Sequence, residues 1–144
     1  MDGKFITKNS QETLELGEKF ALKLQPGETL LLVGDLGAGK TTFVQGIAKG
    51  LGIKDRILSP TFVLQRIHQT HYPSIKILNH IDLYRLEGKQ AIDSIGLMET
   101  INEKESITII EWADRLVDFK PNRGYNLKFD YLNENERQIN ITKI

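Results

Sequence analysis

The sequence predicts a single-domain α/β protein of three layers, whose mixed central sheet includes antiparallel hairpins. Two short and continuously apolar segments, 29–33 and 107–110, have the composition of strands that are buried on both faces of a sheet. A helix-period pattern follows the first of them, as in a strand–helix unit. Two other pairs of strand-like segments are too close in sequence to enclose a crossover helix, so each pair is expected to be antiparallel.

Length, charge and cysteine content exclude several kinds of protein. The chain has 144 residues and is 40% hydrophobic, enough for one sizeable core but not for two ordinary domains, so we predict one domain over residues 1–144. The 19 basic residues balance the 19 acidic ones, which leaves no electrostatic footprint for direct nucleic-acid binding. The absence of cysteine excludes disulfide frameworks and thiolate zinc sites. Because no segment resembles a leader or a membrane span, we expect a cytoplasmic protein without a membrane partner.

The first third of the chain predicts a helix, a strand and a second helix. Asn9 or Ser10 can cap a helix of amphipathic spacing, and residues 25–28 end it in a turn. The strand 29–33 then leads into a glycine-rich loop. The helix after this loop has an apolar face of Phe43, Val44, Ile47, Ala48 and Leu51, with Gly52 at its C-terminal end.

The rest of the chain predicts two hairpins on either side of a buried strand. The segments 62–68 and 75–81 are expected to pair antiparallel, and a weaker helical pattern spans 87–101. The buried strand 107–110 follows. The closing hairpin joins 125–131 to 138–141 through the polar turn 133–136.

Residues 34–41 match the phosphate-binding pattern G-x-x-x-x-G-K-[ST] between a predicted strand and a predicted helix, which is the context that this P-loop motif requires. Glycines let the backbone wrap closely around an anion, so that consecutive N–H groups and the helix N-terminus point at the phosphates. Lys40 is expected to reach the β and γ oxygens, Thr41 to bind Mg²⁺ and Thr42 to contact the α-phosphate side. The motif predicts a P-loop NTPase-like fold. The predicted nucleotide-binding residues of the loop are Gly34, Asp35, Leu36, Gly37, Ala38, Gly39, Lys40, Thr41 and Thr42.

Two acidic residues are candidates for the second protein anchor of a nucleotide-bound Mg²⁺. Hard cations prefer oxygen ligands, and the anchor is usually an acid at the end of a neighbouring buried strand. Glu111 follows the strand 107–110, and Asp82 ends the second strand of the first hairpin. Either could be an ordinary solvated carboxylate. With a P-loop present, Glu111 is the favoured metal ligand.

Two further groups near this site have two interpretations each. The segment 59–62, Ser-Pro-Thr-Phe, lies where loops of other P-loop proteins sense a γ-phosphate, so the Thr61 hydroxyl could contact Mg²⁺ or that phosphate. The same four residues would also make a proline-initiated strand start. His80 shares a strand face with Asp82 and could orient that carboxylate, or be a hydrogen-bonded structural histidine.

Four blocks occur in order along the chain: the loop at 34–42, Ser-Pro-Thr-Phe at 59–62, His-x-Asp-Leu-Tyr-Arg-Leu at 80–86 and Ile-Glu-Trp at 110–112. This set resembles the TsaE family, small ATPases of bacterial tRNA modification, along nearly the whole chain. The resemblance implies a protein that binds ATP and Mg²⁺ and is required for threonylcarbamoyladenosine at position 37 of tRNA. It implies TsaB and TsaD as partners, with the transferase chemistry in TsaD. ATP hydrolysis would be coupled to the turnover of that pair, and tRNA would be contacted only through the complex.

The resemblance also implies roles for individual residues. Residues 34–42 would bind the phosphates, Thr41 and Glu111 would hold Mg²⁺, and Thr61 and Asp82 would belong to the hydrolysis-linked part of the site. Asp82, or a group that it positions, would orient the attacking water. The expected catalytic residues are Lys40, Asp82 and Thr61.

Six residues are less clearly placed by the resemblance. Thr7, Thr13 and Arg137 lie in regions where the family closes around the adenine, although for Arg137 an exposed strand residue is the commoner fate. Trp112 would lie near the nucleotide or the partner surface, or be an ordinary core aromatic. Tyr84 and Arg85 share that ambiguity, although an arginine beside phosphates could stabilise transition-state charge.

Other P-loop functions fit the sequence less well. A GTPase would need an Asn-Lys-x-Asp segment for base recognition, which the sequence lacks, so adenine is the expected base. A small-molecule kinase would need an arginine-rich lid, and Arg115, Arg123 and Arg137 are too scattered to suggest one. A nucleotide-sensing assembly factor, which hydrolyses ATP negligibly until it docks, is compatible with the family and stays an alternative.

Overall fold

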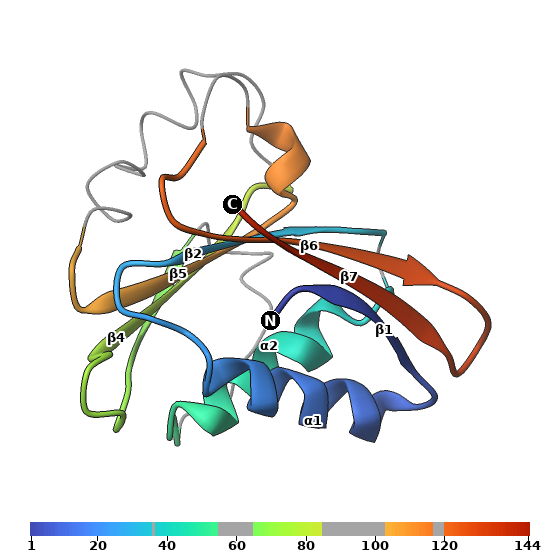
Figure 1. Ribbon diagram of the computed structural model, residues 1–144, viewed down its shortest axis with the longest axis horizontal. Coiled ribbons are helices and arrows are strands. Elements are labelled where there is room, and N and C mark those ends of the chain that lie inside the picture. The colour runs from blue at the N-terminus through green and yellow to red at the C-terminus, as the bar shows by residue number, and fades with distance from the viewer. Residues whose placement is uncertain (36, 55–64, 85–102, 117–119) are drawn as a thin grey trace.

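The computed structural model describes residues 1–35, 37–54, 65–84, 103–116 and 120–144, and in this part of the chain seven strands form one mixed sheet (Figure 1). The spatial order is β1-β7-β6-β2-β5-β4-β3. The pairs β2–β5, β2–β6 and β4–β5 are parallel, whereas β1–β7, β6–β7 and β3–β4 are antiparallel, so the predicted mixed sheet with antiparallel hairpins is confirmed. The strands are β1 (Gly3–Thr7), β2 (Thr29–Val33), β3 (Gln65–Gln69), β4 (Ile77–Asp82), β5 (Ser106–Glu111), β6 (Gly124–Tyr131) and β7 (Arg137–Lys143).

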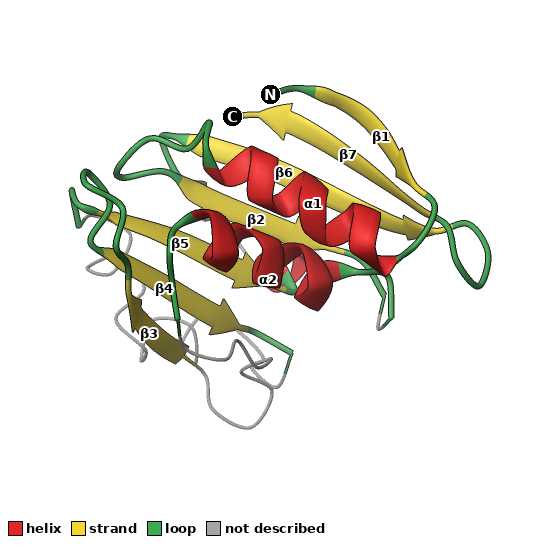
Figure 2. Cartoon of the chain, turned by 90° about the horizontal axis from the view of Figure 1, so that it is seen from below, coloured by secondary structure: helices red, strands yellow, loops and turns green. Residues whose placement is uncertain are grey.

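Two helices, α1 (Ser10–Ala21) and α2 (Lys40–Gly50), lie together on one face of the sheet (Figure 2). Asn9 caps α1 as predicted, because its side-chain oxygen accepts a hydrogen bond of 2.8 Å from the Glu12 N–H. The Glu12 carboxylate also accepts a hydrogen bond of 2.8 Å from the Lys8 N–H, just before the N-cap, which further fixes the start of the helix. No helix in the described residues has both the length and the apolar content that crossing a membrane requires.

Two glycines allow α1 and α2 to pack in direct backbone contact. A Cβ atom at Gly46 would lie 2.0 Å from the Leu14 carbonyl oxygen, and one at Gly17 would lie 2.3 Å from the Phe43 carbonyl oxygen. No side chain fits at either distance, so glycine is required at both positions. The close contact fixes α2, and therefore the loop that precedes it, against α1.

Alternation along β2 separates two apolar clusters on opposite faces of the sheet. Leu30 and Leu32 are fully buried in the larger cluster, which contains the helices, whereas Leu31 and Val33 pack in a smaller cluster on the other face. The 3₁₀ helix η1 (Ala113–Arg115) belongs to the smaller cluster and lies across the sheet from α1 and α2 (Figure 1). The prediction that β2 is buried on both faces is therefore confirmed.

The strand that the sequence did not predict is β1. Its five residues include three exposed ones, and its pairing in the described sheet is with β7 at the edge, so it needs no apolar run of its own. The other predicted strands and both described helices are present, and Gly52 follows α2 with a φ of 71°, as expected of a helix-ending glycine. The predicted helix 87–101 and the first residues of the predicted strand 62–68 lie outside the described residues.

Candidate functional site

The parallel strands β2, β4 and β5 end at the same edge of the sheet, and a cavity of about 420 Å³ opens there. Ligand sites of open α/β sheets collect at this edge. One wall of the cavity, here called the loop wall, is formed by Gly37, Gly39, Lys40, Thr41 and Thr42, which belong to the loop after β2 and the first turn of α2. The facing wall, here called the acid wall, carries Asp82 at the end of β4 and Glu111 at the end of β5.

The loop wall depends on backbone conformations that favour glycine. Gly34, Gly37 and Gly39 have φ values of 153°, 80° and 99°. Gly34 also passes so close to β6 that a Cβ atom would lie 2.7 Å from the Phe129 carbonyl oxygen. Gly39 is the N-cap of α2 and has no side chain to cap the helix, which leaves the N–H groups of the first turn available to a ligand. Leu36, predicted to bind nucleotide, lies outside the described residues.

Lys40 is held inside the site. It is 5% exposed, its Nζ donates a hydrogen bond to the Gly34 carbonyl oxygen, and the same Nζ lies 4.0 Å from the centroid of the Trp112 ring. Burial lowers the pKa of Lys40, and the negative charges of Glu111 and Asp82 oppose that effect. A bound phosphate would add further negative charge in favour of the ammonium form.

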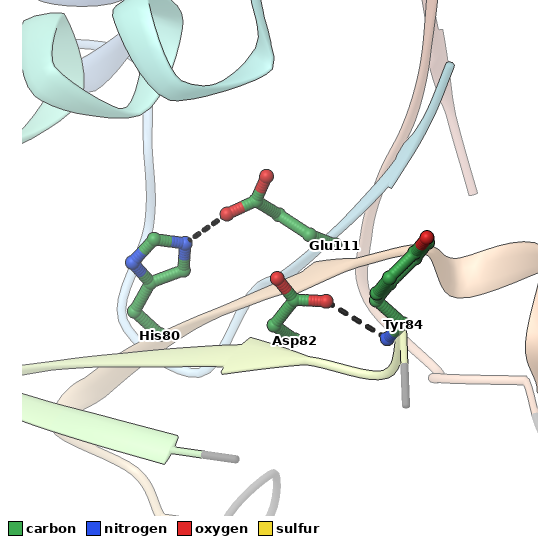
Figure 3. Close-up of polar contacts among 4 residues, drawn as sticks. All are labelled: His80, Asp82, Tyr84 and Glu111. Atoms are coloured by element: carbon green, nitrogen blue, oxygen red, sulfur yellow. Dashed lines mark hydrogen bonds and ion pairs between the residues drawn. The ribbon is translucent and has the colours of Figure 1, made fainter. Parts of the chain in front are cut away.

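Both carboxylates of the acid wall are buried beside the cavity. Asp82 is 4% exposed, and its Oδ1 accepts a hydrogen bond of 2.8 Å from the Tyr84 N–H (Figure 3). Burial raises the pKa of Asp82, the Tyr84 hydrogen bond opposes this, and the negative charge of Glu111 raises it further. Glu111 is 3% exposed, and the β4–β5 register places it directly beside Asp82. The two strand-end acids that the sequence indicated therefore lie side by side.

His80 contacts Glu111 rather than Asp82. Its Nε2 lies 2.5 Å from Glu111 Oε2, and its side chain is fully buried (Figure 3). Of the two interpretations of His80, a direct contact with Asp82 is not found, whereas the hydrogen-bonded histidine is, with Glu111 as its partner across β4 and β5. The physical reason is the register, which places Glu111 opposite Asp82 and within reach of a ring two residues earlier on the same face.

Arg137 ties the closing hairpin to the loop wall. Its Nε donates a hydrogen bond of 3.0 Å to the Gly37 carbonyl oxygen, and its guanidinium lies 4.4 Å from the centroid of the Tyr131 ring. Another nitrogen of the same side chain donates to the carbonyl oxygens of Asn133 and Glu136. Arg137 also lines the cavity, so it is part of the site's rim and not a freely exposed strand residue.

Several cavity residues escaped the sequence analysis or were left open by it. The start of α1 contributes Asn9 and Ser10, which the sequence had indicated only as helix caps, and Thr13, for which the resemblance had left a place near the adenine open. Tyr84 and Trp112 line the cavity with their rings 5.0 Å apart, and so Trp112 is not an ordinary core aromatic. Trp112 has a φ of 57°, the one positive value among described residues other than glycine, directly after the Glu111 strand end. Thr61 and Arg85 lie outside the described residues.

The donor set suits Mg²⁺ that is bound together with phosphates. Thr41 supplies a hydroxyl and Glu111 a carboxylate to the same cavity, and both are hard oxygen ligands. In the described part of the chain, no group of three or more histidine, aspartate or glutamate residues could hold a metal by itself.

The fold and the loop at its sheet edge define an α/β protein with a P-loop NTPase-like fold. Residues 7–139 match the family model described as "Threonylcarbamoyl adenosine biosynthesis protein TsaE", and the chain belongs to this family. It is similar to a tRNA threonylcarbamoyladenosine biosynthesis protein TsaE of a Nostoc species, with 41% identity over 96% of this chain and 85% of the relative. It is 34% identical to the Bacillus subtilis protein of that name, over 98% of this chain and 85% of the relative. The crystal structure of Bacillus subtilis YdiB matches with a TM-score of 0.80 and 30% identity, covering 100% of this chain and 86% of that chain.

Proposed function

We propose that this protein binds ATP with Mg²⁺ in the cavity between the loop wall and the acid wall and hydrolyses the ATP during threonylcarbamoyladenosine modification of tRNA at position 37. The observation that carries the proposal is the convergence of Lys40, the uncapped start of α2 and two buried carboxylates on one cavity. The relatives are named for threonylcarbamoyladenosine biosynthesis, which supports the choice of process. The proposed partners are TsaB and TsaD, whose turnover would be coupled to hydrolysis.

The loop wall would bind the triphosphate. The N–H groups at the start of α2 and the Lys40 ammonium supply positive charge where the β and γ oxygens would lie. When bound, Mg²⁺ would be held by the Thr41 hydroxyl and the Glu111 carboxylate and would neutralise phosphate charge. Lys40 would exchange its contact with the Gly34 carbonyl oxygen for phosphate oxygens.

The acid wall would position the attacking water. Asp82 Oδ1 accepts the Tyr84 N–H, which holds the carboxylate in place, and the other oxygen would accept a hydrogen bond from the attacking water. The water oxygen would form a bond to the γ-phosphorus while the bond from that phosphorus to the β–γ bridging oxygen breaks, which releases ADP and inorganic phosphate. Asp82 orients the nucleophile in this scheme. The loop wall binds the group that is transferred.

The test is an ATPase assay on the chain alone and with the purified TsaB–TsaD pair from the same organism. Strong activation by the pair is expected, and Lys40→Ala should lower the activity roughly 100- to 1,000-fold because it removes a charged donor from the developing phosphate charge. Lys49→Ala is the matched control. Lys49 lies in the last turn of the same helix, its side chain is 63% exposed, and it forms an ion pair with Glu18. Unchanged hydrolysis by Lys40→Ala would refute the site assignment. Phosphorylation of an added metabolite, without an effect of the pair, would indicate a kinase instead.

A further inference from the structure

Glu111 has a buried neighbour for which the proposed function does not yet account. The Nε2 of His80 lies 2.5 Å from Glu111 Oε2, and the two side chains are 0% and 3% exposed. Glu111 lines the cavity, whereas His80 is absent from its lining and lies behind the carboxylate. Figure 3 shows the other oxygen of Glu111 directed away from the imidazole. One oxygen of this carboxylate is therefore engaged by the protein and the other is available at the cavity.

The charges around Glu111 would otherwise favour a different arrangement. Lys40, Asp82 and Glu111 line the same cavity, and at such burial a carboxylate and an ammonium attract each other strongly. Yet no ion pair joins Lys40 to either acid, although all three residues are described. Lys40 contacts the Gly34 carbonyl oxygen and the Trp112 ring instead. Lys40, Asp82 and Glu111 each contact a different neighbouring group, and the three side chains do not pair with one another.

The hydrogen bonding of His80 is one-sided. Its Nδ1 is buried and has no hydrogen-bond partner in the described part of the chain, so the contact with Glu111 is the polar interaction that the ring makes there. A histidine kept for packing would gain nothing from a buried polar nitrogen without a partner, and an apolar residue could fill the same volume. The contact with the carboxylate is what distinguishes His80 from an apolar residue.

We propose that His80 is a positioning residue, whose ring N–H holds one oxygen of Glu111 so that the second oxygen is presented to the divalent cation of the bound nucleotide. This inference rests on the proposed function, because it assumes that Glu111 is a ligand of that cation. It goes further in assigning a residue that touches neither nucleotide nor metal. Partners of this kind, which orient a metal ligand from behind, typically change metal affinity roughly 10- to 100-fold when they are removed.

The test measures cation binding rather than turnover. Mn²⁺ replaces Mg²⁺ and is titrated by electron paramagnetic resonance into protein saturated with a non-hydrolysable ATP analogue. We expect His80→Leu to weaken Mn²⁺ binding roughly 10- to 100-fold, and His80→Gln, whose amide can still donate toward Glu111, to recover part of that loss. Analogue binding measured in excess EDTA should stay within about twofold of the unmodified protein, because the loop wall is untouched.

Two controls make the result decisive. His68→Leu places the same change on another buried histidine, in β3, away from Glu111, and is expected to leave Mn²⁺ affinity unchanged. If His80→Leu does not fold, His80→Asn provides the comparison, since its amide is too short to reach the carboxylate and should fail where His80→Gln succeeds. Circular dichroism and thermal melting without ligand establish which variants are folded.

The outcomes separate this inference from the function on which it rests. If Glu111→Gln weakens Mn²⁺ binding and the folded His80 variants do not, His80 is a structural residue and the positioning role is refuted while the proposed site stands. If Glu111→Gln leaves Mn²⁺ binding unchanged, Glu111 is not a metal ligand and both proposals on this residue fail. Loss in His80→Leu with recovery in His80→Gln supports the positioning role.

Discussion

The two walls of the cavity are built in different ways. The loop wall comes from a single local stretch of the chain between β2 and the first turn of α2, and its chemistry comes mainly from backbone N–H groups whose directions depend on positive φ angles at Gly34, Gly37 and Gly39. The acid wall is formed by side chains from two strands, β4 and β5, which are far apart in sequence because parallel neighbours need a crossover connection of about a dozen residues or more. Asp82 and Glu111 become neighbours because β4 and β5 pair in parallel in one register.

This difference separates what each wall can do. The backbone N–H groups of the loop wall bind phosphate only while the backbone keeps its conformation, so few substitutions that change this conformation are tolerated. The acid wall instead depends on register, because a slip of one strand by one residue would turn its carboxylate to the other face of the sheet and separate Asp82 from Glu111. Changes in the loop wall should therefore lower affinity or stability. Changes in the acid wall should lower the rate of hydrolysis and leave nucleotide binding largely intact.

The largest expected effect is on the rate after Asp82→Asn. The amide keeps the shape of the side chain and can still accept the Tyr84 N–H, but it no longer offers a carboxylate to the attacking water. We expect hydrolysis in the presence of TsaB and TsaD to fall roughly 100- to 10,000-fold, the range typical of a positioned acid–base group. Single-turnover assays give the rate, and titration with a non-hydrolysable ATP analogue gives the affinity.

If Asp82→Asn loses analogue binding along with hydrolysis, the two walls do not divide binding and hydrolysis between them. That result would place Asp82 in nucleotide binding or in the structure of the site. Lys40→Ala is the reciprocal variant, because it removes a charged donor to the triphosphate and is expected to lower the affinity for the analogue as well as the rate of hydrolysis.

The next effect concerns stability in the loop wall. Gly34→Ala combines a positive φ with a Cβ atom 2.7 Å from the Phe129 carbonyl oxygen, whereas Gly37→Ala has a positive φ and open space around its Cβ position. Backbone strain of this kind costs about 1–3 kcal/mol. Both variants should lose stability, and Gly34→Ala should lose more because β6 must also shift. Urea unfolding without nucleotide measures both, and equal losses would show that contact with β6 is unimportant.

The loop wall could be predicted from sequence because its determinants are local. The motif 34–41, the apolar strand before it and the amphipathic helix after it are all contained in one short stretch, and β2 spans the predicted residues 29–33. Glu111 and Asp82 were also indicated, because acids that follow buried strands of a parallel sheet meet at one edge. Their roles in binding and hydrolysis stay predictions.

The contacts that the sequence did not indicate depend on pairing between distant segments. The partner of His80 follows from the β4–β5 register, which no local pattern encodes. The Lys40 contact with Trp112 and the approach of Arg137 to Gly37 likewise join segments that are far apart in sequence. β1 was missed because an exposed edge strand needs little apolar content.

The smallest expected effect, and the one that most directly tests the burial of the acid wall, is the pH dependence of stability. Burial raises the pKa of Asp82 above its ordinary value of 3.8, so the folded protein binds this proton more tightly than the unfolded chain does. The stability that the protonated form contributes is fully present below the ordinary pKa. It is lost as the pH rises through the raised pKa of the folded state.

Asp82→Asn removes that loss, because the amide is neutral at every pH in this range. In the absence of nucleotide the variant should therefore be more stable than the unmodified protein at neutral pH, with a gain in Tm of about 2–4 °C for each kcal/mol. The gain should shrink as the pH is lowered toward the ordinary aspartate pKa, where both proteins carry a neutral group. Glu105→Gln, which changes an exposed carboxylate paired with Lys76, should show little difference at either pH. If the variant were less stable than its parent at neutral pH, the Tyr84 hydrogen bond and nearby positive charge would outweigh the burial of Asp82. The charged form of Asp82 would then not lower the stability of the folded protein.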